Sequence, residues 1–482
     1  MSRVVVIGAG VGGLAAAIRL AAAGHEVTVH ERATDVGGKL GRYERDGFLF
    51  DTGPSLLTLP RVFTDLGLTL DPVALDPVVR HVFPDGRTLD SSPDPAVFAG
   101  RIAEALGAGA AADWARFWRR AERIWAASWR SVLQREVSPA SLARLSWRVG
   151  DLAAIAPGRS LRALGRRYLR DWRLRMLLDR YATYTGTDPR RAPAALAAIP
   201  YAELAFGGWY LPGGLGVLGT ALLDRCAALG VTIRTSSTVT GIRTGDGRVT
   251  GVDLDSGAGS PADVVVSDVD AATLYRELLP TPGRLAALAD RSLAGFVLLL
   301  GVRGETPQLA HHTVFFPRDY DAEFDAVFGD PGHGRRAHPP SDPTVFVTRA
   351  ADPAVHPPGA EAWFVLVNAP ATARRPARST GGGPASRRRT AATSSTCWPP
   401  AASTSATGSR SWRPAPRRTS PTPPRHPAAR STARRAGSCD RPTADRSTVC
   451  TWWAARPTPA AACRWSPCRR RSSRTPSARP DR

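Results

Sequence analysis

The apolar positions near the start of the chain follow first the pattern of a buried strand and then that of a helix. Residues 4–7 form a continuous apolar run, residues 14–23 are rich in alanine and leucine, and residues 27–30 form a second apolar run. This order predicts a strand, a helix and a second strand, the first unit of a parallel sheet. We therefore expect an α/β fold at this end of the chain.

Later apolar runs predict two further groups of elements. The first is a helix at residues 215–229 with strands at 231–233, 237–242, 248–252 and 262–267, and the second has strands at 296–302, 312–316, 344–348 and 363–367. Residues 72–198, rich in alanine, leucine, arginine and tryptophan, are predicted to be mostly helical. Because the first group returns to the pattern of the start of the chain after a long insertion, we expect two interleaved domains.

Four tryptophans fall on one side of a helix within this insertion: Trp114, Trp118, Trp125 and Trp129. At 100° per residue they lie within about 60° of one another, and arginines are interleaved with them. A buried helix face explains this stripe. A helix that lies in a membrane interface, with its tryptophans in the apolar layer, explains it equally well.

A glycine-rich turn joins the first strand to the first helix. It contains Gly8, Gly10, Gly12 and Gly13, and Glu31 ends the second strand. In this context the first glycine permits a tight turn, the second lets the backbone approach a pyrophosphate, and the last lets the helix pack closely on the strand. The helix N-terminus offers N–H groups to phosphates, and Glu31 is placed to accept hydrogen bonds from an adenosine ribose. The sequence therefore predicts a dinucleotide site.

The net charge of +22 is concentrated in one segment. Residues 371–482 contain 24 arginines and 3 aspartates without lysine or glutamate, so the preceding 370 residues carry a net charge of only +1. The same segment lacks leucine, isoleucine, phenylalanine and tyrosine, and holds five of the six cysteines at irregular spacing. This composition cannot bury a core, so we expect a disordered tail, and the odd cysteine count indicates no disulfide framework.

Three interpretations of this tail remain open. It is a basic arm for nucleic acid or anionic lipid, a linker without function, or the product of a shifted reading frame in a GC-rich gene. The last agrees with the abundance of arginine, alanine, proline, serine and threonine, which shifted GC-rich codons tend to encode.

Residues 3–370 resemble the bacterial carotenoid desaturases, the phytoene-desaturase type of FAD-dependent amine-oxidase-like flavoproteins. The resemblance rests on the first glycine loop, Glu31, Gly37-Gly38-Lys39 and, above all, the string FDTGPSLLTLP at residues 50–60. The strings YTGTDPRRAP (184–193), GGWYLPGG (207–214) and LAHHTVFF (309–316) fit the same family. The resemblance implies a Rossmann-like FAD-binding domain interleaved with a mixed α+β domain for substrate and membrane association.

The resemblance also implies a division of the chain and a set of FAD-binding residues. FAD-binding parts are expected at residues 1–72 and 201–290, a helical substrate and membrane part at 73–200, a substrate-domain sheet at 291–370 and the tail at 371–482. The implied residues are Gly8, Gly10, Gly12 and Gly13 at the pyrophosphate, Glu31 at the ribose, the backbone of Val239 at the adenine, Gly38, Lys39 and Arg42 toward the phosphates and flavin, and Gly53, Pro54 and Ser55 beside the isoalloxazine ring.

The implied reaction is desaturation of phytoene or a related carotenoid, with hydride transfer to the flavin and loss of a neighbouring proton. Lys39 stands where phytoene-acting members usually carry arginine, which favours a later-acting hydroxycarotenoid 3,4-desaturase or a C30 substrate; another amine-oxidase-superfamily flavoenzyme is a further alternative. No catalytic residue is assigned. No metal is expected, because adjacent His311 and His312 on a strand would point to opposite faces.

The expected partners are a carotenoid and a membrane surface, with the protein cytoplasmic and peripherally bound to the cell membrane. Nucleic acid is not expected: a basic nucleic-acid-binding protein is the non-enzyme alternative, and it rests wholly on the tail.

The tail as written lacks a C-terminal stretch that members of this family carry, close to GLYLVGxxxHPGGGLP. Read one nucleotide back, with C or G at the free positions, residues 457–465 become HPGGGLPL, and residues 450–454 become LYLVG when the cysteine codon is TGT. We therefore predict a one-base frameshift near residues 369–378. The literal chain would then lack the last FAD-binding element and have little or no activity.

Overall fold

The computed structural model describes residues 1–134, 149–286, 292–330, 333–371 and 452–453. The chain divides into two units, and every described residue belongs to the first, which comprises residues 1–375 and 450–463. The tail predicted at residues 371–482 therefore lies outside the described residues, apart from Ala371, Trp452 and Trp453.

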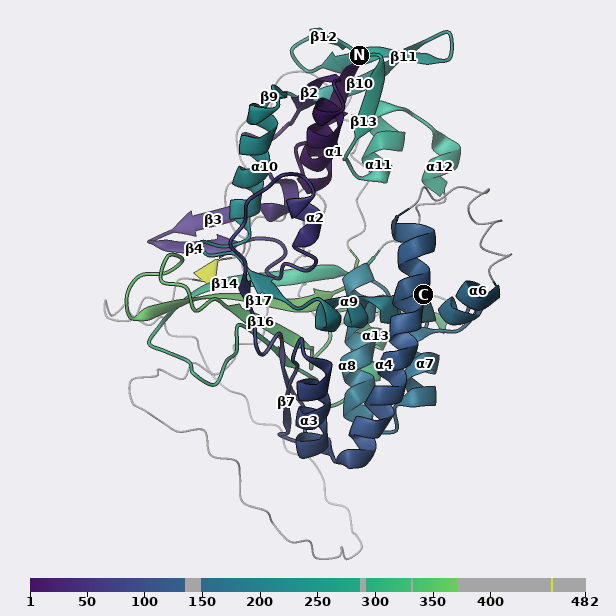
Figure 1. Cartoon of the computed structure of the whole chain (residues 1–482), viewed down its shortest axis with the longest axis vertical. Coiled ribbons are helices and arrows are strands. Elements are labelled where there is room, and N and C mark those ends of the chain that lie inside the picture. Colours follow the sequence, from purple (N-terminus) through teal and green to yellow (C-terminus); the bar gives the residue numbers. More distant parts are fainter. Residues whose placement is uncertain (135–148, 287–291, 331–332, 372–451, 454–482) are drawn as a thin grey trace, which may run out of the picture. The chain divides into compact units, whose positions relative to one another are not determined.

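Four parallel strands form the sheet expected at the start of the chain, in the order β13–β1–β2–β9 (Figure 1). Two distant segments build it: β1 (Arg3–Ile7), α1 (Val11–Ala22) and β2 (Glu26–His30) from the first, and α10 (Gly216–Ala228), β9 (Thr232–Arg234) and β13 (Val264–Ser267) from the second. Because β1 lies between β2 and β13 and is covered on both faces, its sequence is continuously apolar.

The two faces of β1 belong to different cores, because alternate residues of a strand point to opposite faces. Val4 and Val6 pack with α1 and α10, whereas Val5 and Ile7 pack with β10 and β11. An antiparallel sheet comprises β10 (Val239–Gly245), β11 (Arg248–Leu254) and β12 (Gly259–Pro261), and short helices follow β13: α11 (Ala271–Thr273), η5 (Leu274–Leu278) and α12 (Pro282–Ala286).

Seven strands form a second sheet, in the order β18–β14–β17–β16–β15–β6–β7. Four of them are the late strands predicted from the sequence: β14 (Ala294–Arg303), β15 (His312–Phe315), β16 (Val345–Arg349) and β17 (Ala360–Ala369). The edge strand β18 (Trp452–Trp453) pairs with β14, so these two residues join this sheet.

The expectation that residues 72–198 are mostly helical is wrong at their start. The strands β5 (Val73–Ala74), β6 (Arg80–Val82) and β7 (Thr88–Asp90) precede the first helix of this segment, and β6 pairs in parallel with β15. Strands of two or three residues are too short to show an alternating pattern, so only their tertiary pairing reveals them.

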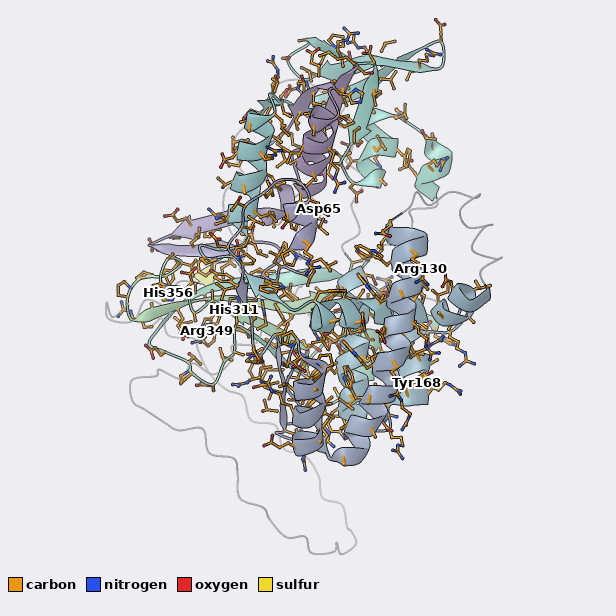
Figure 2. The ribbon with its side chains drawn as sticks, viewed as in Figure 1. Asp65, Arg130, Tyr168, His311, Arg349 and His356 are labelled. Carbon is orange, nitrogen blue, oxygen red and sulfur yellow. The ribbon has the colours of Figure 1, made fainter. Side chains whose placement is uncertain are left out.

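Helices make up the rest of this segment and pack around a common core with Phe98, Phe117, Leu164 and Phe324. They are α3 (Pro95–Leu106), α4 (Ala108–Ser128), η2 (Trp129–Leu133), α6 (Val149–Ile155), α7 (Leu161–Tyr168), α8 (Trp172–Arg180), η3 (Tyr181–Thr185), η4 (Ala194–Ala197) and α9 (Ala198–Ala205), joined by α13 (Tyr320–Phe328) from later in the chain. Tyr168, labelled in Figure 2, ends α7. Within the described ranges, no helix has the length and apolar character needed to cross a membrane.

The tryptophan stripe of α4 is directed mainly into this core. Trp114 is 2% exposed and contacts Phe98 edge-on, with ring centroids 5.2 Å apart. Trp118 and Trp125 are half-buried and pack against Tyr201 of α9. The buried-face interpretation is therefore correct for Trp114, whereas Trp118 and Trp125 are buried only in part.

Smaller elements connect the two sheets. They are η1 (Gly38–Leu40), the hairpin of β3 (Arg42–Arg45) and β4 (Phe48–Asp51), α2 (Arg61–Thr64), and β8 (Trp209–Tyr210), which pairs with β5. The residues predicted to surround the flavin end of the cofactor lie on and beside these elements.

Candidate functional site

The first glycine loop adopts the tight turn that its spacing predicts. Gly8 has a φ of +99°, and its N–H donates to the His30 carbonyl at 2.8 Å. A Cβ at Gly13 would clash with the Gly8 carbonyl oxygen, so only glycine lets α1 begin this close to β1. Gly10 is the N-cap of α1 and has no side chain to satisfy the first N–H groups of the helix. The loop is therefore built to accept an anion.

The carboxylate of Asp268 lies over this loop. Asp268 directly follows β13, at the carboxyl end of a strand parallel to β1. A Cβ at Gly10 would come within 2.5 Å of Asp268 Oδ2, and one at Gly12 within 2.5 Å of Oδ1. Burial raises the pKa of the Asp268 carboxyl, although a hydrogen bond from the Gly13 N–H opposes this. Asp268 was not predicted as a site residue, although an acid at the end of a parallel strand marks the edge where ligands bind.

Glu31 directly follows β2, and its carboxylate contacts the same loop. Its Oε2 accepts a hydrogen bond from the Ala9 N–H and its Oε1 one from the Ala33 N–H, both at 2.8 Å. Each carboxylate oxygen keeps acceptor capacity for a further donor such as a ribose hydroxyl. The side chain of Val239, by contrast, is 7% exposed and packs in the core beneath β1, so only its backbone is available to a ligand.

The second glycine turn lies against the first. The Gly37 N–H donates to the Ala9 carbonyl at 2.8 Å, and a Cβ at Gly38 would lie 3.0 Å from Gly10 Cα. Lys39 is exposed. A Cβ at Gly53 would clash with the Lys39 carbonyl oxygen, so the second turn also packs against the start of the GPS segment. Residues predicted from three separate motifs are thus brought together.

Asp51 ties the FDTGPS string to α10. Its Oδ2 accepts from the Leu215 N–H at 2.7 Å and its Oδ1 from the Gly216 N–H at 3.1 Å, which caps the start of that helix. Burial raises the pKa of the Asp51 carboxyl. Arg42 Nη2 donates to the Gly213 carbonyl at 3.3 Å, so Arg42 holds the end of the GGWYLPGG segment and Asp51 the start of the helix that follows it.

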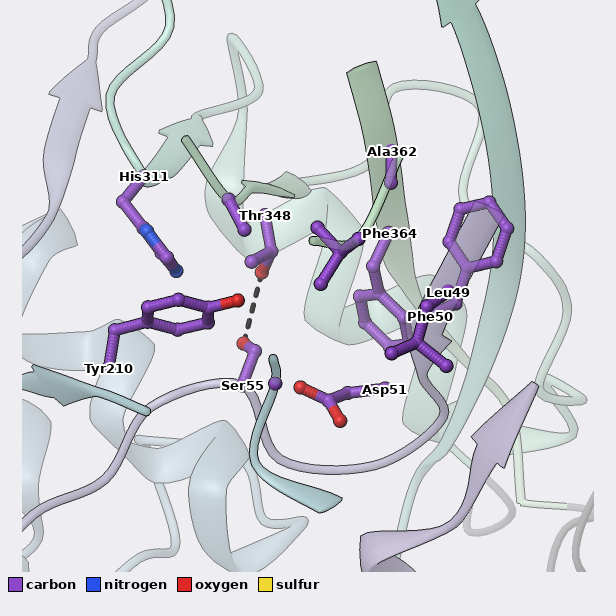
Figure 3. Close-up of a pocket in the computed structure, with 12 residues that line it drawn as sticks. Leu49, Phe50, Asp51, Ser55, Tyr210, His311, Thr348, Ala362 and Phe364 are labelled. Atoms are coloured by element: carbon purple, nitrogen blue, oxygen red, sulfur yellow. Dashed lines mark hydrogen bonds between the residues drawn. The ribbon is translucent and has the colours of Figure 1, made fainter. Parts of the chain in front are cut away.

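A cavity of about 40 Å³ lies where β4 and β8 meet the second sheet (Figure 3). Apolar side chains lie on one side of it, and most of the polar ones on the other: Leu49, Phe50, Ala362 and Phe364 against Ser55, Tyr210, His311 and Thr348. Ser55 Oγ lies 3.0 Å from Thr348 Oγ1 and 3.1 Å from His312 Nε2. Ser55, predicted beside the flavin ring, therefore borders a half-apolar cavity, whereas Pro54 is exposed.

The adjacent histidines lie side by side, so the expectation that they point to opposite faces is wrong. Their ring centroids are 4.6 Å apart, because β15 begins at His312 and His311 precedes the strand. Burial, with Arg349 nearby, lowers the pKa of His311 to about 4, so the ring is neutral near pH 7. Among the residues that the structure describes, no group of three or more potential metal ligands occurs.

Tyr210, which lines this cavity, forms a polar pair with Asp352, and neither was predicted. The Tyr210 hydroxyl and the Gly213 N–H both donate to Asp352 Oδ2 at 2.7 Å. The Tyr210 ring centroid lies 4.7 Å from that of His311. The two partners are 142 residues apart in sequence, and the GGWYLPGG string that contains Tyr210 was the signal that could have pointed to it.

The chain belongs to the family of flavin-containing amine oxidoreductases, whose family model matches residues 11–301. It is accordingly an FAD-dependent oxidoreductase with the fold that the sequence predicted. It is 35% identical to 4,4'-diapolycopene oxygenase of Methylomonas sp., over 76% of each chain. It is 34% identical to phytoene dehydrogenase of Streptomyces griseus, over 77% of this chain and 74% of that one, and 35% identical to hydroxyneurosporene desaturase of Cereibacter sphaeroides, over 78% and 77%.

Solved structures give the same fold. The crystal structure of an oxidoreductase from Methanosarcina mazei superposes with a TM-score of 0.52 at 19% sequence identity, covering 76% of this chain and 78% of that one. At this identity the likeness concerns the fold alone.

The residues present fit FAD at the diphosphate end. Gly10 and Gly12 leave the backbone without side chains on the face that Asp268 covers, and a bare backbone is what the close approach of a pyrophosphate requires. The helix N-terminus and the acceptor at Glu31 complete a site of the dinucleotide type. The carboxylates of Asp268 and Glu31 carry charges there that oppose a phosphate.

Proposed function

We propose that the flavin chemistry of this chain is the desaturation of a carotenoid, phytoene or a related polyene. The observation that carries the proposal is the 34–35% identity to three relatives whose names all give carotenoid substrates. When bound, the flavin supplies a hydride acceptor. Phe50, Phe364 and their apolar neighbours suit a hydrocarbon chain and keep water away from it.

Within this proposal, the residues predicted from the sequence hold the cofactor. They are Gly8, Gly10, Gly12 and Gly13 at the diphosphate, Glu31 at the ribose, the Val239 backbone at the adenine, Gly38, Lys39 and Arg42 toward the phosphates and flavin, and Gly53, Pro54 and Ser55 at the ring. The contacts between the two glycine turns support a continuous binding surface. The same proposal assigns residues 1–72 and 201–290 to FAD binding and residues 73–200 and 291–370 to the substrate.

We also propose that the gene carries a one-base frameshift near residues 369–378. The matches to these relatives cover 76–78% of this chain and 74–77% of the relatives' own lengths. The matched share of this chain is about as long as the part that precedes Thr372. The written chain would then lack the last FAD-binding element, and the nucleic-acid alternative, which rests on the written tail, would lose its basis.

The test is to express two genes, one as written and one with the missing base restored, in cells that accumulate phytoene. We expect a shift of pigment absorbance to longer wavelengths with the restored gene only, because each added double bond lengthens the polyene. Activity of the written gene would contradict the frameshift. Inactivity of both genes, with the restored protein soluble and yellow with flavin, would contradict phytoene as substrate.

The same cells can separate the alternative substrates. Supplying a hydroxycarotenoid or a C30 carotenoid in place of phytoene tests the two alternatives that Lys39 favours, a later-acting 3,4-desaturase and an enzyme for a C30 substrate. The identity to a diapolycopene oxygenase adds one more outcome, a product that has gained oxygen. Mass spectrometry distinguishes it, because desaturation removes two hydrogens and oxygenation adds an oxygen atom.

We propose that the chain meets a membrane through arginines on the outer side of its helical part. Five exposed arginines there form no ion pair with a described acidic residue: Arg119, Arg123, Arg159, Arg166 and Arg167. Burial lowers the pKa of Arg120, and the charges of Arg123, Arg159 and Arg167 lower it further, because these guanidinium groups are close. Such a cluster suits the phosphates of anionic lipids. A peripheral location at the cytoplasmic face follows from this proposal.

The restored-frame protein should lose most of its binding to anionic vesicles when Arg119, Arg123, Arg166 and Arg167 are replaced by serine. The matched control replaces four exposed arginines elsewhere: Arg61, Arg248, Arg276 and Arg303. The restored frame is needed because the arginines of the written tail would bind such vesicles by themselves. Co-sedimentation measures the effect, and equal binding by the two variants would refute this surface.

A further inference from the structure

We infer that Asp268 sets the affinity of the dinucleotide site by placing a carboxylate where the diphosphate must lie. This inference deepens the proposed function, because it rests on the placement of the FAD diphosphate over the first glycine loop. It concerns a residue outside the glycine motifs, directly after a strand that enters the sheet more than 250 residues after them.

The Asp268 carboxylate lies directly over the first glycine loop. The two Asp268 carboxylate oxygens each come within 2.5 Å of the position that a Cβ would take, Oδ2 at Gly10 and Oδ1 at Gly12. These are the positions where the absence of side chains lets a pyrophosphate approach the backbone. The carboxylate therefore lies in the space that a bound diphosphate needs, and the ligand must displace it or lie in contact with it.

Charges near the loop also affect a bound diphosphate. The N-terminus of α1 attracts negative charge, and the Asp268 carboxylate already uses this attraction, since the Gly13 N–H hydrogen-bonds to it. Glu31 adds a second negative charge close enough to raise the pKa of Asp268, whereas Lys39 acts in the opposite direction. A diphosphate thus enters a loop that faces two carboxylates and one lysine.

Removal of the Asp268 charge is expected to change the affinity for the diphosphate. In the variant Asp268→Asn the side chain keeps its shape and its oxygen can still accept from the Gly13 N–H. The charge is gone, and the amide can donate to a phosphate oxygen. Repulsion between two unit charges about 4 Å apart weakens binding by about a factor of five even at the dielectric constant of water. At a partly buried site the repulsion is stronger. We therefore expect Asp268→Asn to tighten binding about tenfold.

The experiment uses the restored-frame protein and ADP-ribose, followed by isothermal titration calorimetry. ADP-ribose carries the adenine, the ribose and the diphosphate but no flavin, so its binding does not depend on the flavin end of the site. Two variants serve as controls. Asp246→Asn removes an equal charge at an exposed hairpin turn, where asparagine tolerates the φ of 51°, and Gly10→Ala places a methyl group in the loop.

The expected result is a Kd about tenfold lower for Asp268→Asn, an unchanged Kd for Asp246→Asn and a clear loss of binding for Gly10→Ala. A merely structural role for Asp268 would weaken binding instead. Unchanged or weaker binding by Asp268→Asn, with Gly10→Ala still impaired, would overturn this inference and leave the proposed placement intact. Absence of binding in every variant, or binding insensitive to Gly10→Ala, would overturn the placement and the inference with it.

Discussion

Replacing Glu203 with leucine is expected to lower the free energy of unfolding by about 3–5 kcal/mol, because it leaves a buried arginine without its counter-charge. Glu203 is 2% exposed and Arg180 is 4% exposed. Arg180 Nη2 lies 3.5 Å from Glu203 Oε1, and the hydroxyls of Tyr181 and Tyr184 donate to the same carboxylate at 2.7 and 2.9 Å. The substitution removes the acceptor for all three groups at once.

Urea unfolding of the full-length chain, followed by tryptophan fluorescence, measures this effect, because Trp114 lies in the same core. Two further variants separate charge from packing. Glu203→Gln keeps hydrogen-bond acceptors and should cost less than Glu203→Leu, and the double variant Arg180→Leu with Glu203→Leu should recover much of the stability, since no charge then remains buried. If Glu203→Leu is as stable as the parent, the Arg180 guanidinium is hydrated, and the prediction that it is left buried without a counter-charge is wrong.

Gly13→Ala is the second large effect expected, with a loss of about 3 kcal/mol or more and no detectable binding of ADP-ribose. A Cβ at Gly13 would overlap the Gly8 carbonyl oxygen, which belongs to the backbone and has no room to withdraw. The start of α1 would have to move away from β1, and the glycine loop would open. This cost outweighs the gain in helix propensity of about 1 kcal/mol that alanine otherwise brings.

Gly12→Ala is the matched control, because it makes the same change one residue earlier in the same helix. Its Cβ would meet only the end of the Asp268 side chain, which can rotate away. Thermal unfolding of the two variants should therefore separate them clearly, with Gly12→Ala close to the parent. Equal stability of Gly13→Ala and Gly12→Ala would mean that α1 does not pack on the Gly8 turn as described.

The motifs of the nucleotide site were readable from the sequence because they are local. A strand, a glycine turn and a helix specify their own geometry, and Gly8 and Gly13 show it in the turn and in the close packing of α1. The contacts of Gly38 with Gly10 and of Gly53 with Lys39 join separate motifs; the family resemblance implies a role for these residues in FAD binding but not their contacts with one another.

Other features depended on partners distant in sequence and were missed or misjudged. The three-residue strand β6 exists because β15 pairs with it, and it has no periodicity of its own. The stripe that contains Trp114 has two explanations, and only the packing of α3 and α9 on α4 shows that Trp114 itself is buried. His311 was placed on a strand that begins one residue later, so its direction was wrong.

The sequence by itself determined the class of fold, the family, the cofactor and the position of the first glycine loop, since each follows from patterns within about sixty consecutive residues or from a long family string. Only the tertiary structure decided that Asp268 lies over that loop and that Tyr210 contacts both Asp352 and His311. The physical reason is that these contacts join segments more than 90 residues apart, and no local spacing encodes which strand ends meet at one edge of a sheet.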